Sequence, residues 1–274
     1  MSAMQPSFSR ANLGRHVSRQ VRQVMRASGM LLTIGEGFVL AARHGALTQP
    51  NQPEHTRLIR YFCRRMCKVL GVTVQVHGDM PVEHALWVSN HVSWIDIPVI
   101  GSVTRVFFLS KAEVADWPLM GRLAQAGGTL FIRRGSGDSD SVRGQIATFL
   151  KQKLPVLFFP EATTTDGKQV RRLHGRLLAA ALETGTPIQP VLLCYANQAK
   201  QLDEVIPFVG DVSFPDHLQQ VLAHDRVVAH VVALPAIDPV GHDIHSLTDL
   251  LQAEMRAGLA LLQGRVLHPI VMGG

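Results

Sequence analysis

The spacing of apolar residues along the chain changes near residue 70. Upstream, apolar residues fill most of residues 27–42 and then recur near a 3.6-residue period over residues 54–70, with basic residues between them. Both stretches therefore predict helices. Downstream, short apolar and β-branched runs predict seven strands, at residues 72–76, 85–88, 106–109, 129–132, 156–159, 188–194 and 227–234.

Helical stretches fall between and after these strands. Residues 139–151 and 246–262 show helical spacing, and Asp138 or Ser139 can cap the first of them. Strands that alternate with helices are typical of an α/β domain built around one sheet. We therefore expect an α/β fold with a central mixed sheet flanked by helices and preceded by N-terminal membrane-associated helices.

The first predicted helix carries mixed signals about a membrane. Arginines precede and follow its apolar run of 16 residues, and Glu36 interrupts it. Such a run is about 24 Å long as a helix, shorter than the about 20 residues that cross a bilayer. Arginines on both sides give no orientation under the positive-inside rule. A helix lying in the membrane interface accounts for these features, and packing on the domain is the alternative.

Composition points to a partner that is apolar, acidic or both. Charged residues make up 18% of the chain, hydrophobic residues 46%, and the formal net charge is +6. Soluble domains average about 25% charged residues. Such a chain suits an anionic lipid, an acidic carrier protein or a nucleic acid. An odd number of cysteines excludes a disulfide framework, and we expect buried neutral thiols at Cys63, Cys67 and Cys194.

The clearest chemical feature follows the predicted strand at residues 85–88. His91 comes directly after Asn90, and Asp96 lies five residues further on. On a strand-to-helix turn, the carboxylate can bond one imidazole nitrogen and fix the tautomer. The other nitrogen is then free to take a proton from a hydroxyl. The pair alone is a weak signal, because a core histidine and a helix-capping aspartate look the same in sequence.

Three further segments follow at the ends of predicted strands. Residues 128–134 end in two arginines, residues 158–165 run from a strand into a polar turn, and residues 186–191 open another strand. In α/β sheets, strand ends and their loops build the site. An arginine at such an end can grip a phosphate through two parallel hydrogen bonds, although a surface arginine paired with a nearby aspartate is the alternative.

In this order the four segments resemble the glycerolipid acyltransferase family, which includes the 1-acylglycerol-3-phosphate acyltransferases. The resemblance covers about residues 85–195. The family's Asn-His-x-Ser-x-x-Asp block is matched by Asn90, His91, Ser93 and Asp96. The other three blocks are matched by Gly128, Phe131, Ile132 and Arg134, then by Phe159, Pro160, Glu161 and Thr163, and then by Pro187, Ile188, Pro190 and Val191.

The resemblance implies direct acyl transfer, from an acyl-carrier protein or coenzyme A thioester to the hydroxyl of a lysophospholipid, with 1-acylglycerol-3-phosphate as the expected acceptor. His91 would be the general base and Asp96 would stabilise its imidazolium. Neither a metal, a cofactor nor a nucleic-acid partner is expected. The candidate substrate-binding residues are Arg134, Arg133, Glu161, Thr163, Ser93 and Lys111. Glu161 could instead satisfy backbone amides of its own turn.

The same resemblance places the protein at the cytoplasmic face of the inner membrane. Residues 1–50 would form the membrane-associated segment and residues 51–274 the acyltransferase domain.

Two residues depart from the family pattern in the third block. Ala162 replaces glycine, and because alanine adopts positive φ less freely we expect this turn to differ slightly. Thr164 replaces arginine, which removes a phosphate contact and makes a lyso-ornithine lipid O-acyltransferase the nearest alternative. A lipid hydrolase or thioesterase is a second class, although no Gly-x-Ser-x-Gly elbow is present. A non-catalytic membrane-binding module is a third.

Overall fold

The computed structural model describes residues 10–81, 84–133 and 139–267, with side chains in the first helix from residue 17 onward. Two residues singled out from the sequence, Arg134 and the possible helix cap Asp138, lie outside these ranges. The helices are α1 (Arg10–Arg43), α2 (His55–Leu70), α3 (Asp96–Val103), α4 (Met120–Ala126), α5 (Ser139–Lys151), α6 (Ala179–Thr184), α7 (Phe214–Ala223) and α8 (Ile244–Leu267). The strands are β1 (Val72–His77), β2 (Leu86–Ser89), β3 (Phe107–Lys111), β4 (Leu130–Ile132), β5 (Val156–Phe158), β6 (Ile188–Ala196) and β7 (Val227–Ala233).

The strands form one seven-stranded sheet in the order β1-β7-β6-β2-β5-β3-β4. Strands β6, β2, β5, β3 and β4 run parallel, whereas β7 runs antiparallel to β6 and carries β1 parallel to itself. All seven predicted strands are present, with bounds shifted by one or two residues. The mixed α/β fold is therefore confirmed. Since five neighbouring strands are parallel, β2, β5, β3 and β4 all end at one edge of the sheet.

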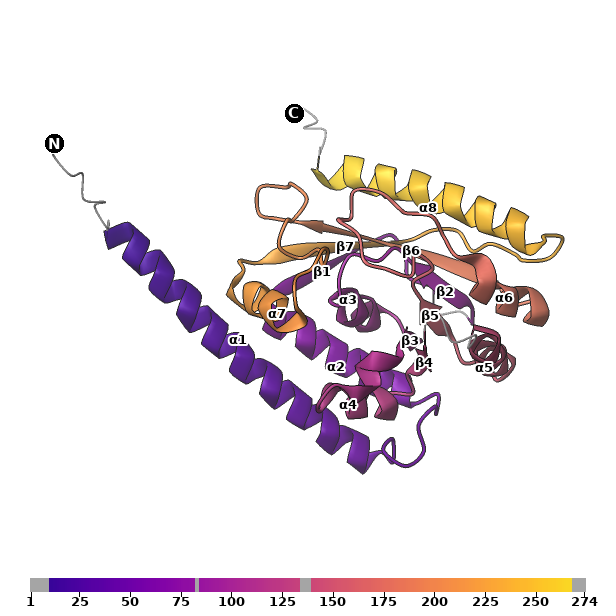
Figure 1. Cartoon of the computed structure of the whole chain (residues 1–274), viewed down its shortest axis with the longest axis horizontal. Coiled ribbons are helices and arrows are strands. Elements are labelled where there is room, and N and C mark those ends of the chain that lie inside the picture. The colour runs from indigo at the N-terminus through magenta and orange to yellow at the C-terminus, as the bar shows by residue number, and fades with distance from the viewer. Residues whose placement is uncertain (1–9, 82–83, 134–138, 268–274) are drawn as a thin grey trace.

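Helices cover both faces of the sheet (Figure 1). Buried residues of α5, α6 and α8 form the core on one face, and those of α2, α3 and α7 form the core on the other. Strand β2 supplies both cores, because Leu86 and Val88 point to the first and Trp87 to the second. A strand that is buried on both faces reads as a continuous apolar run, which is why the sequence pattern identified it.

Helix α1 is longer than its apolar run predicted, since it begins at Arg10 and spans 34 residues. Arginine and glutamine form helices readily, so the basic stretch continues the helix. Glu36 inside the apolar run is explained by α2, because its carboxylate accepts a hydrogen bond from Tyr61 at 2.6 Å and pairs with Arg65 at 3.3 Å. Residues Val17–Arg43 are long and apolar enough to cross a membrane.

One stripe of α1 faces away from the domain. Apolar residues recur along it with helical spacing and are all exposed, while Ile34 on the other side is buried in the core. The stripe consists of Val17, Val21, Val24, Met25, Leu31, Leu32 and Val39.

The three cysteines are all free and buried. Burial raises the pKa of Cys67 and of Cys194 to about 12, and it raises the pKa of Cys63 as well. The expectation of neutral, structural thiols is confirmed.

Candidate active site

The turn between β2 and α3 lies at the carboxyl edge of the sheet, between the ends of β6 and β5. Asn90 is the first residue of this turn, and its side chain pairs with the backbone of β6 as a strand residue would. Its amide nitrogen donates to the Leu193 carbonyl at 3.0 Å, and its amide oxygen accepts from the Leu193 N–H at 2.8 Å. Since Asn90 is buried, these two bonds fix the start of the turn against β6.

His91 and Asp96 form the pair that their spacing predicted. The Nδ1 of His91 lies 2.7 Å from Oδ2 of Asp96. The same oxygen accepts the backbone N–H groups of Val92 at 2.7 Å and Ser93 at 3.0 Å. Because the carboxylate accepts only, Nδ1 carries the ring proton and Nε2 of neutral His91 is left with a free lone pair.

Tyr195 completes the environment of Asp96, and sequence reasoning did not identify it. Its hydroxyl donates to Oδ1 of Asp96 at 2.7 Å from the far end of β6. Asp96 is fully buried and Tyr195 almost so. Burial raises the pKa of Tyr195 well above its ordinary value, and the Asp96 charge raises it further, so the phenol stays a donor. A tyrosine inside a buried apolar strand needs a partner, which is the signal the sequence offered.

The His91 ring is held by stacking as well as by Asp96. Phe159, directly after β5, lies parallel to it with ring centroids 3.9 Å apart and planes 13° from parallel. The His91 side chain keeps 19% of its surface exposed, whereas Asp96 keeps none. Asp96 and Phe159 therefore fix the orientation of the imidazole while part of it stays exposed, as a base that meets a substrate must be.

Glu161 supports the same turn through backbone amides. Its two oxygens accept the N–H groups of His91 and Arg171, each at 2.8 Å. Burial raises the pKa of Glu161, and the two amides counteract part of that rise. The Thr165 N–H donates to the His91 carbonyl at 2.8 Å, so the third block fastens His91 on both sides of its peptide. Glu161 therefore binds backbone amides, as the alternative above expected, but they belong to His91 and Arg171 and not to its own turn, and a direct contact of Glu161 with substrate stays a prediction.

The turn after Glu161 was expected to differ slightly because alanine replaces glycine, but its backbone keeps a glycine-like conformation. Ala162 has a φ of 58°, so it adopts the left-handed conformation that glycine would adopt freely. Thr163 is exposed at the surface. The hydroxyl of Thr164 donates to the backbone carbonyl of Phe208. The residue that replaces the family's arginine is thus a link to a segment outside the four blocks.

The remaining candidate residues lie at different depths and distances. Ser93 has no exposed surface and contributes its backbone amide to Asp96, and a contact of its side chain with substrate stays a prediction. Lys111 ends β3 and Arg133 follows β4, both at the carboxyl edge. At about 4.8 Å per strand, they lie roughly 10 and 14 Å along the sheet from the end of β2. Arg134 lies outside the described residues.

The fourth block lies away from this edge. Pro187 precedes β6, and its carbonyl accepts the N–H of Leu86 at the amino end of β2. The block therefore sets the pairing of β6 with β2, and the opposite end of β6 carries the two residues that reach the site, Leu193 and Tyr195.

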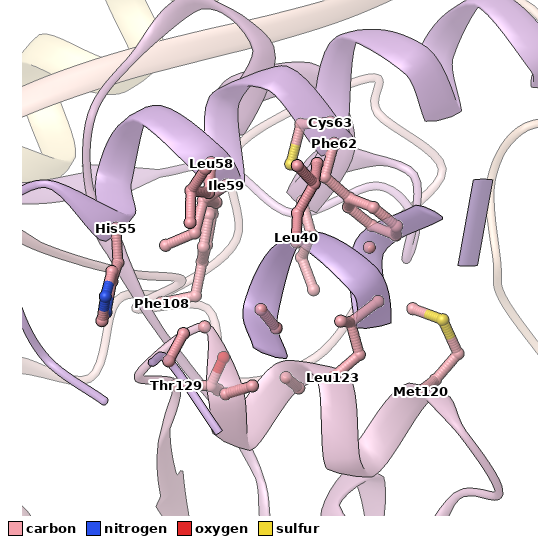
Figure 2. A pocket seen from close by; sticks show the side chains of 17 residues that line it. Leu40, His55, Leu58, Ile59, Phe62, Cys63, Phe108, Met120, Leu123 and Thr129 are labelled. Carbon is pink, nitrogen blue, oxygen red and sulfur yellow. The ribbon is translucent and has the colours of Figure 1, made fainter. Parts of the chain in front are cut away.

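An apolar pocket lies between α1, α2, α3, β3 and α4 (Figure 2). It encloses about 790 Å³ of space, part of it open to solvent. Ile97, the residue after Asp96, lines it together with Phe62, Phe108 and Met120. Within the described ranges, no three His, Cys, Asp or Glu side chains gather as a metal site requires. Ile97 thus links the turn that carries His91 and Asp96 to the wall of an apolar pocket.

Comparisons with known proteins agree on one kind of protein. The Acyltransferase family profile matches residues 73–194. The lyso-ornithine lipid O-acyltransferase of Pseudomonas aeruginosa is 40% identical over 88% of this chain and 94% of its own length. The 1-acyl-sn-glycerol-3-phosphate acyltransferase of Neisseria meningitidis serogroup B is 28% identical over 72% of this chain and 78% of its own.

The fold resembles a solved structure. The crystal structure of the 1-acyl-sn-glycerophosphate (LPA) acyltransferase PlsC from Thermotoga maritima superposes with a TM-score of 0.69 and 19% identity. The match covers 92% of this chain and 98% of that one. At this identity the likeness concerns the fold alone.

Proposed function

The chain belongs to the acyltransferase family, and we propose that it transfers a fatty acyl chain from a thioester to the free hydroxyl of a lyso-ornithine lipid. Acyl transfer to a lysolipid is the activity class that the relatives share. One observation carries the chemistry: His91 bonds the buried Asp96 through Nδ1, which leaves Nε2 available as a base on a side chain that keeps 19% of its surface exposed.

The proposed reaction is a single displacement at the thioester carbonyl. Nε2 of His91 accepts the proton of the acceptor hydroxyl as its oxygen attacks the carbonyl carbon. Asp96 stabilises the imidazolium that forms, and Tyr195 keeps the carboxylate in place. The tetrahedral intermediate then expels the thiolate, which takes the proton back from His91. An ester and a free thiol result, and no covalent acyl-enzyme is required.

The choice of acceptor rests on the third block and on the relatives. Thr164 stands where a phosphate-binding arginine would stand, and its hydroxyl is bound to the Phe208 carbonyl. An ornithine headgroup has no phosphate and does not need that arginine. The sequence alone favoured 1-acylglycerol-3-phosphate with lyso-ornithine lipid as the alternative. The relative at 40% identity supports the alternative, and we adopt it.

The apolar pocket suits the acyl chain. Its walls are almost entirely hydrocarbon, with His55 and Thr129 as polar exceptions, and burial of each methylene contributes about 0.8 kcal/mol. Either an acyl-carrier protein or a coenzyme A thioester can present such a chain to His91.

The exposed stripe of α1 suits a membrane surface. Its opposite face packs on the domain, so α1 can lie in the interface, at the cytoplasmic side of the membrane, with its exposed stripe toward the lipids.

The function is tested with purified protein and radiolabelled acyl thioesters of both donor types. The acceptors are lyso-ornithine lipid, 1-acylglycerol-3-phosphate and none. We expect label in ornithine lipid and none with His91→Ala. Preferred acylation of 1-acylglycerol-3-phosphate would overturn the acceptor proposal. Release of free fatty acid without an acceptor would indicate a hydrolase, and binding to vesicles without turnover would indicate a non-catalytic module.

The membrane proposal is tested by vesicle flotation. Leu32→Glu places a charge in the exposed stripe and should weaken binding to anionic vesicles. Leu261→Glu is the matched control, because Leu261 on α8 is as exposed, at 75% against 73%. Equal binding of both variants would refute the role of the stripe.

A further inference from the structure

The catalytic turn has a support that lies outside all four sequence blocks. Trp94, between His91 and Asp96, donates its indole N–H to Nδ1 of His217 on α7, at 2.9 Å. His217 is 1% exposed, and its Nε2 lies 3.0 Å from the Val205 carbonyl. One nitrogen must accept and the other must donate, so the ring is neutral with its proton on Nε2. Burial lowers the pKa of His217, which agrees with this state.

The segment that leads into α7 is bound to the turn that carries His91 and to the turn that follows Glu161. The N–H of Phe208 donates to the Val92 carbonyl at 2.9 Å, and its carbonyl accepts the hydroxyl of Thr164. The Phe208 ring lies against His217, with centroids 4.9 Å apart. At the start of α7, the ring of Phe214 meets the edge of Trp94. Three hydrogen bonds and the Trp94–Phe214 ring contact thus join α7 and its entry segment to the turns around His91, and the Phe208–His217 contact holds the entry segment against α7.

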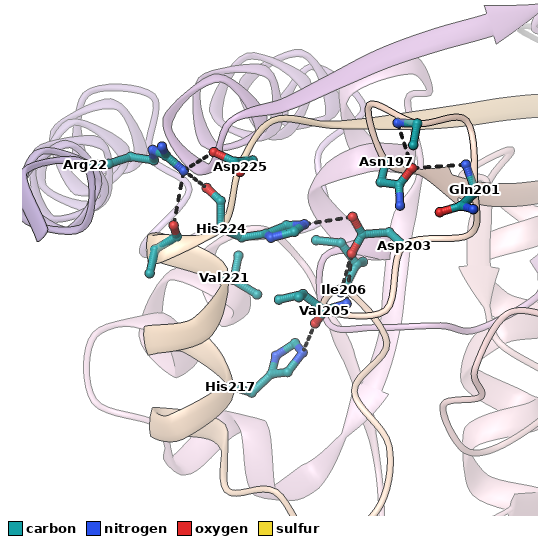
Figure 3. A network of polar contacts seen from close by, with 12 residues as sticks. Arg22, Asn197, Gln201, Asp203, Val205, Ile206, His217, Val221, His224 and Asp225 are labelled. Atoms are coloured by element: carbon teal, nitrogen blue, oxygen red, sulfur yellow. Dashed lines mark hydrogen bonds and ion pairs between the residues drawn. The ribbon is translucent and has the colours of Figure 1, made fainter. Parts of the chain in front are cut away.

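The other end of α7 is held by α1. Arg22 and Arg26 donate to the carbonyls that end the helix, where the helix dipole attracts cations (Figure 3 shows the Arg22 bonds). Arg26 packs so closely on Gly71 that a Cβ there would lie 1.9 Å from its guanidinium. Helix α7 is therefore fixed at both ends, by α1 at one and by the catalytic turn at the other.

We propose that α7 is a brace that positions the catalytic turn, with Trp94 and His217 as positioning residues and with α1 as the support of the brace. This inference rests on the proposed function, because it assigns a role in placing His91. Loss of the Trp94–His217 bond leaves the His91–Asp96 pair intact but removes one of the contacts that hold the peptide segment between them in place. Misplacing a base by a fraction of an ångström reduces the rate of the chemical step while the substrates still bind.

The test compares Trp94→Phe and His217→Leu with His217→Asn, whose amide oxygen can accept near the position of Nδ1. We expect the first two to lower kcat by about tenfold or more, with KM for donor and acceptor within about twofold. His217→Asn should recover most of the loss. The double variant Trp94→Phe/His217→Leu should lose no more than the worse single variant, because both remove one bond.

Several outcomes would overturn the inference. Unchanged kcat in Trp94→Phe, multiplied losses in the double variant, or a rise in KM without a fall in kcat would each do so. If His217→Leu does not fold, Trp94→Phe carries the test alone, since it keeps an aromatic ring and removes the donor. An inactive wild type would refute the proposed function, whereas an active wild type with unaffected variants refutes only the brace.

The support from α1 is tested separately. Arg26→Gln removes the guanidinium from the end of α7, and Arg19→Gln changes an exposed arginine on the same helix. We expect Arg26→Gln to lower kcat by about threefold, a difference of roughly 0.6 kcal/mol, with vesicle binding equal to that of Arg19→Gln. Equal kcat in the two variants would show that α1 does not act through α7.

Discussion

Two histidine–aspartate pairs in this molecule are nearly identical in their bonds. His91 lies 2.7 Å from Asp96, and His224 lies 2.7 Å from Asp203. Both carboxylates are buried, and each accepts two backbone N–H groups from the residues beside it. Those amides belong to Val92 and Ser93 in the first pair and to Val205 and Ile206 in the second (Figure 3).

What separates the two pairs is their place in the fold. His91 uses Nδ1 and presents Nε2 at the carboxyl edge of the parallel strands, beside Phe159. His224 uses Nε2, follows the last residue of α7, and has its own carbonyl bound by Arg22 and Arg26. In the proposed reaction the first pair orients a base, whereas the second holds a loop against the end of a helix. A hydrogen-bonded His–Asp pair does not by itself indicate an active site, whereas a position at the carboxyl edge of the parallel strands does.

The largest expected effect separates the pairs directly. His91→Ala should lower kcat by about 100-fold or more, because it removes the positioned base, and Asp96→Asn should also cripple turnover. His224→Ala should lower Tm while retaining most of the turnover. Parallel measurements of acyl transfer and thermal unfolding check this. Comparable losses of kcat in the His91 and His224 variants would show that the two pairs do not have separate roles.

Tyr195 is the one side chain that Asp96 has and Asp203 lacks. Tyr195→Phe leaves Oδ1 of a buried carboxylate without its donor, which costs about 1–3 kcal/mol. We expect lower Tm and a kcat reduced by about tenfold. Tyr61→Phe is the control, because Tyr61 is the only other tyrosine and is exposed. A Tyr195→Phe variant with the kcat of the control would mean that the three bonds to Oδ2 suffice.

Sequence predicted the parts of this comparison that are local. His91 and Asp96 are five residues apart, and the turn between a buried strand and a helix brings them together whatever the rest of the chain does. The strands were equally readable, because each is a short apolar run, and β2, β5 and β6 are buried along their whole length. Glu161 and Phe159 were in a recognised block, although their contacts with His91 required knowing that β5 pairs with β2.

The parts that sequence missed are joined across long separations. Tyr195 reaches Asp96 from 99 residues away, and His217 reaches Trp94 from 123. Such contacts depend on strand order and on how α7 packs, and neither leaves a periodic signal. The full length of α1 was missed for another reason. Its first part is basic, and only its apolar part stood out.

Thr164 lies where the two regions meet, since its hydroxyl bonds the segment that leads from Asp203 to α7. Thr164→Arg would replace this bond with a cation beside the catalytic turn. A charge-assisted contact contributes roughly 1.5–3 kcal/mol, so use of 1-acylglycerol-3-phosphate relative to lyso-ornithine lipid should improve by about tenfold. The ratio of kcat/KM for the two acceptors checks this. Thr164→Val controls for the lost bond, and an equal ratio in both variants would place headgroup selection elsewhere.

The smallest expected effect concerns the fastening pair and its response to pH. Burial alone would raise the pKa of Asp203, but the bonds from His224 and from two backbone amides outweigh it and hold the pKa below its ordinary 3.8. The ionised carboxylate therefore stabilises the fold above that value. The contribution disappears as pH falls through the lower folded-state pKa, because the native state then takes up the proton too.

Asp203→Asn should accordingly lower the free energy of unfolding at pH 7, and the difference in this free energy between variant and wild type should narrow below about pH 4. Asp211→Asn is the control, because Asp211 is exposed. Denaturant unfolding of both variants and of wild type is measured at pH 7 and below about pH 4. A gap that stays constant with pH would mean that Asp203 acts through the shape of its side chain rather than through its charge.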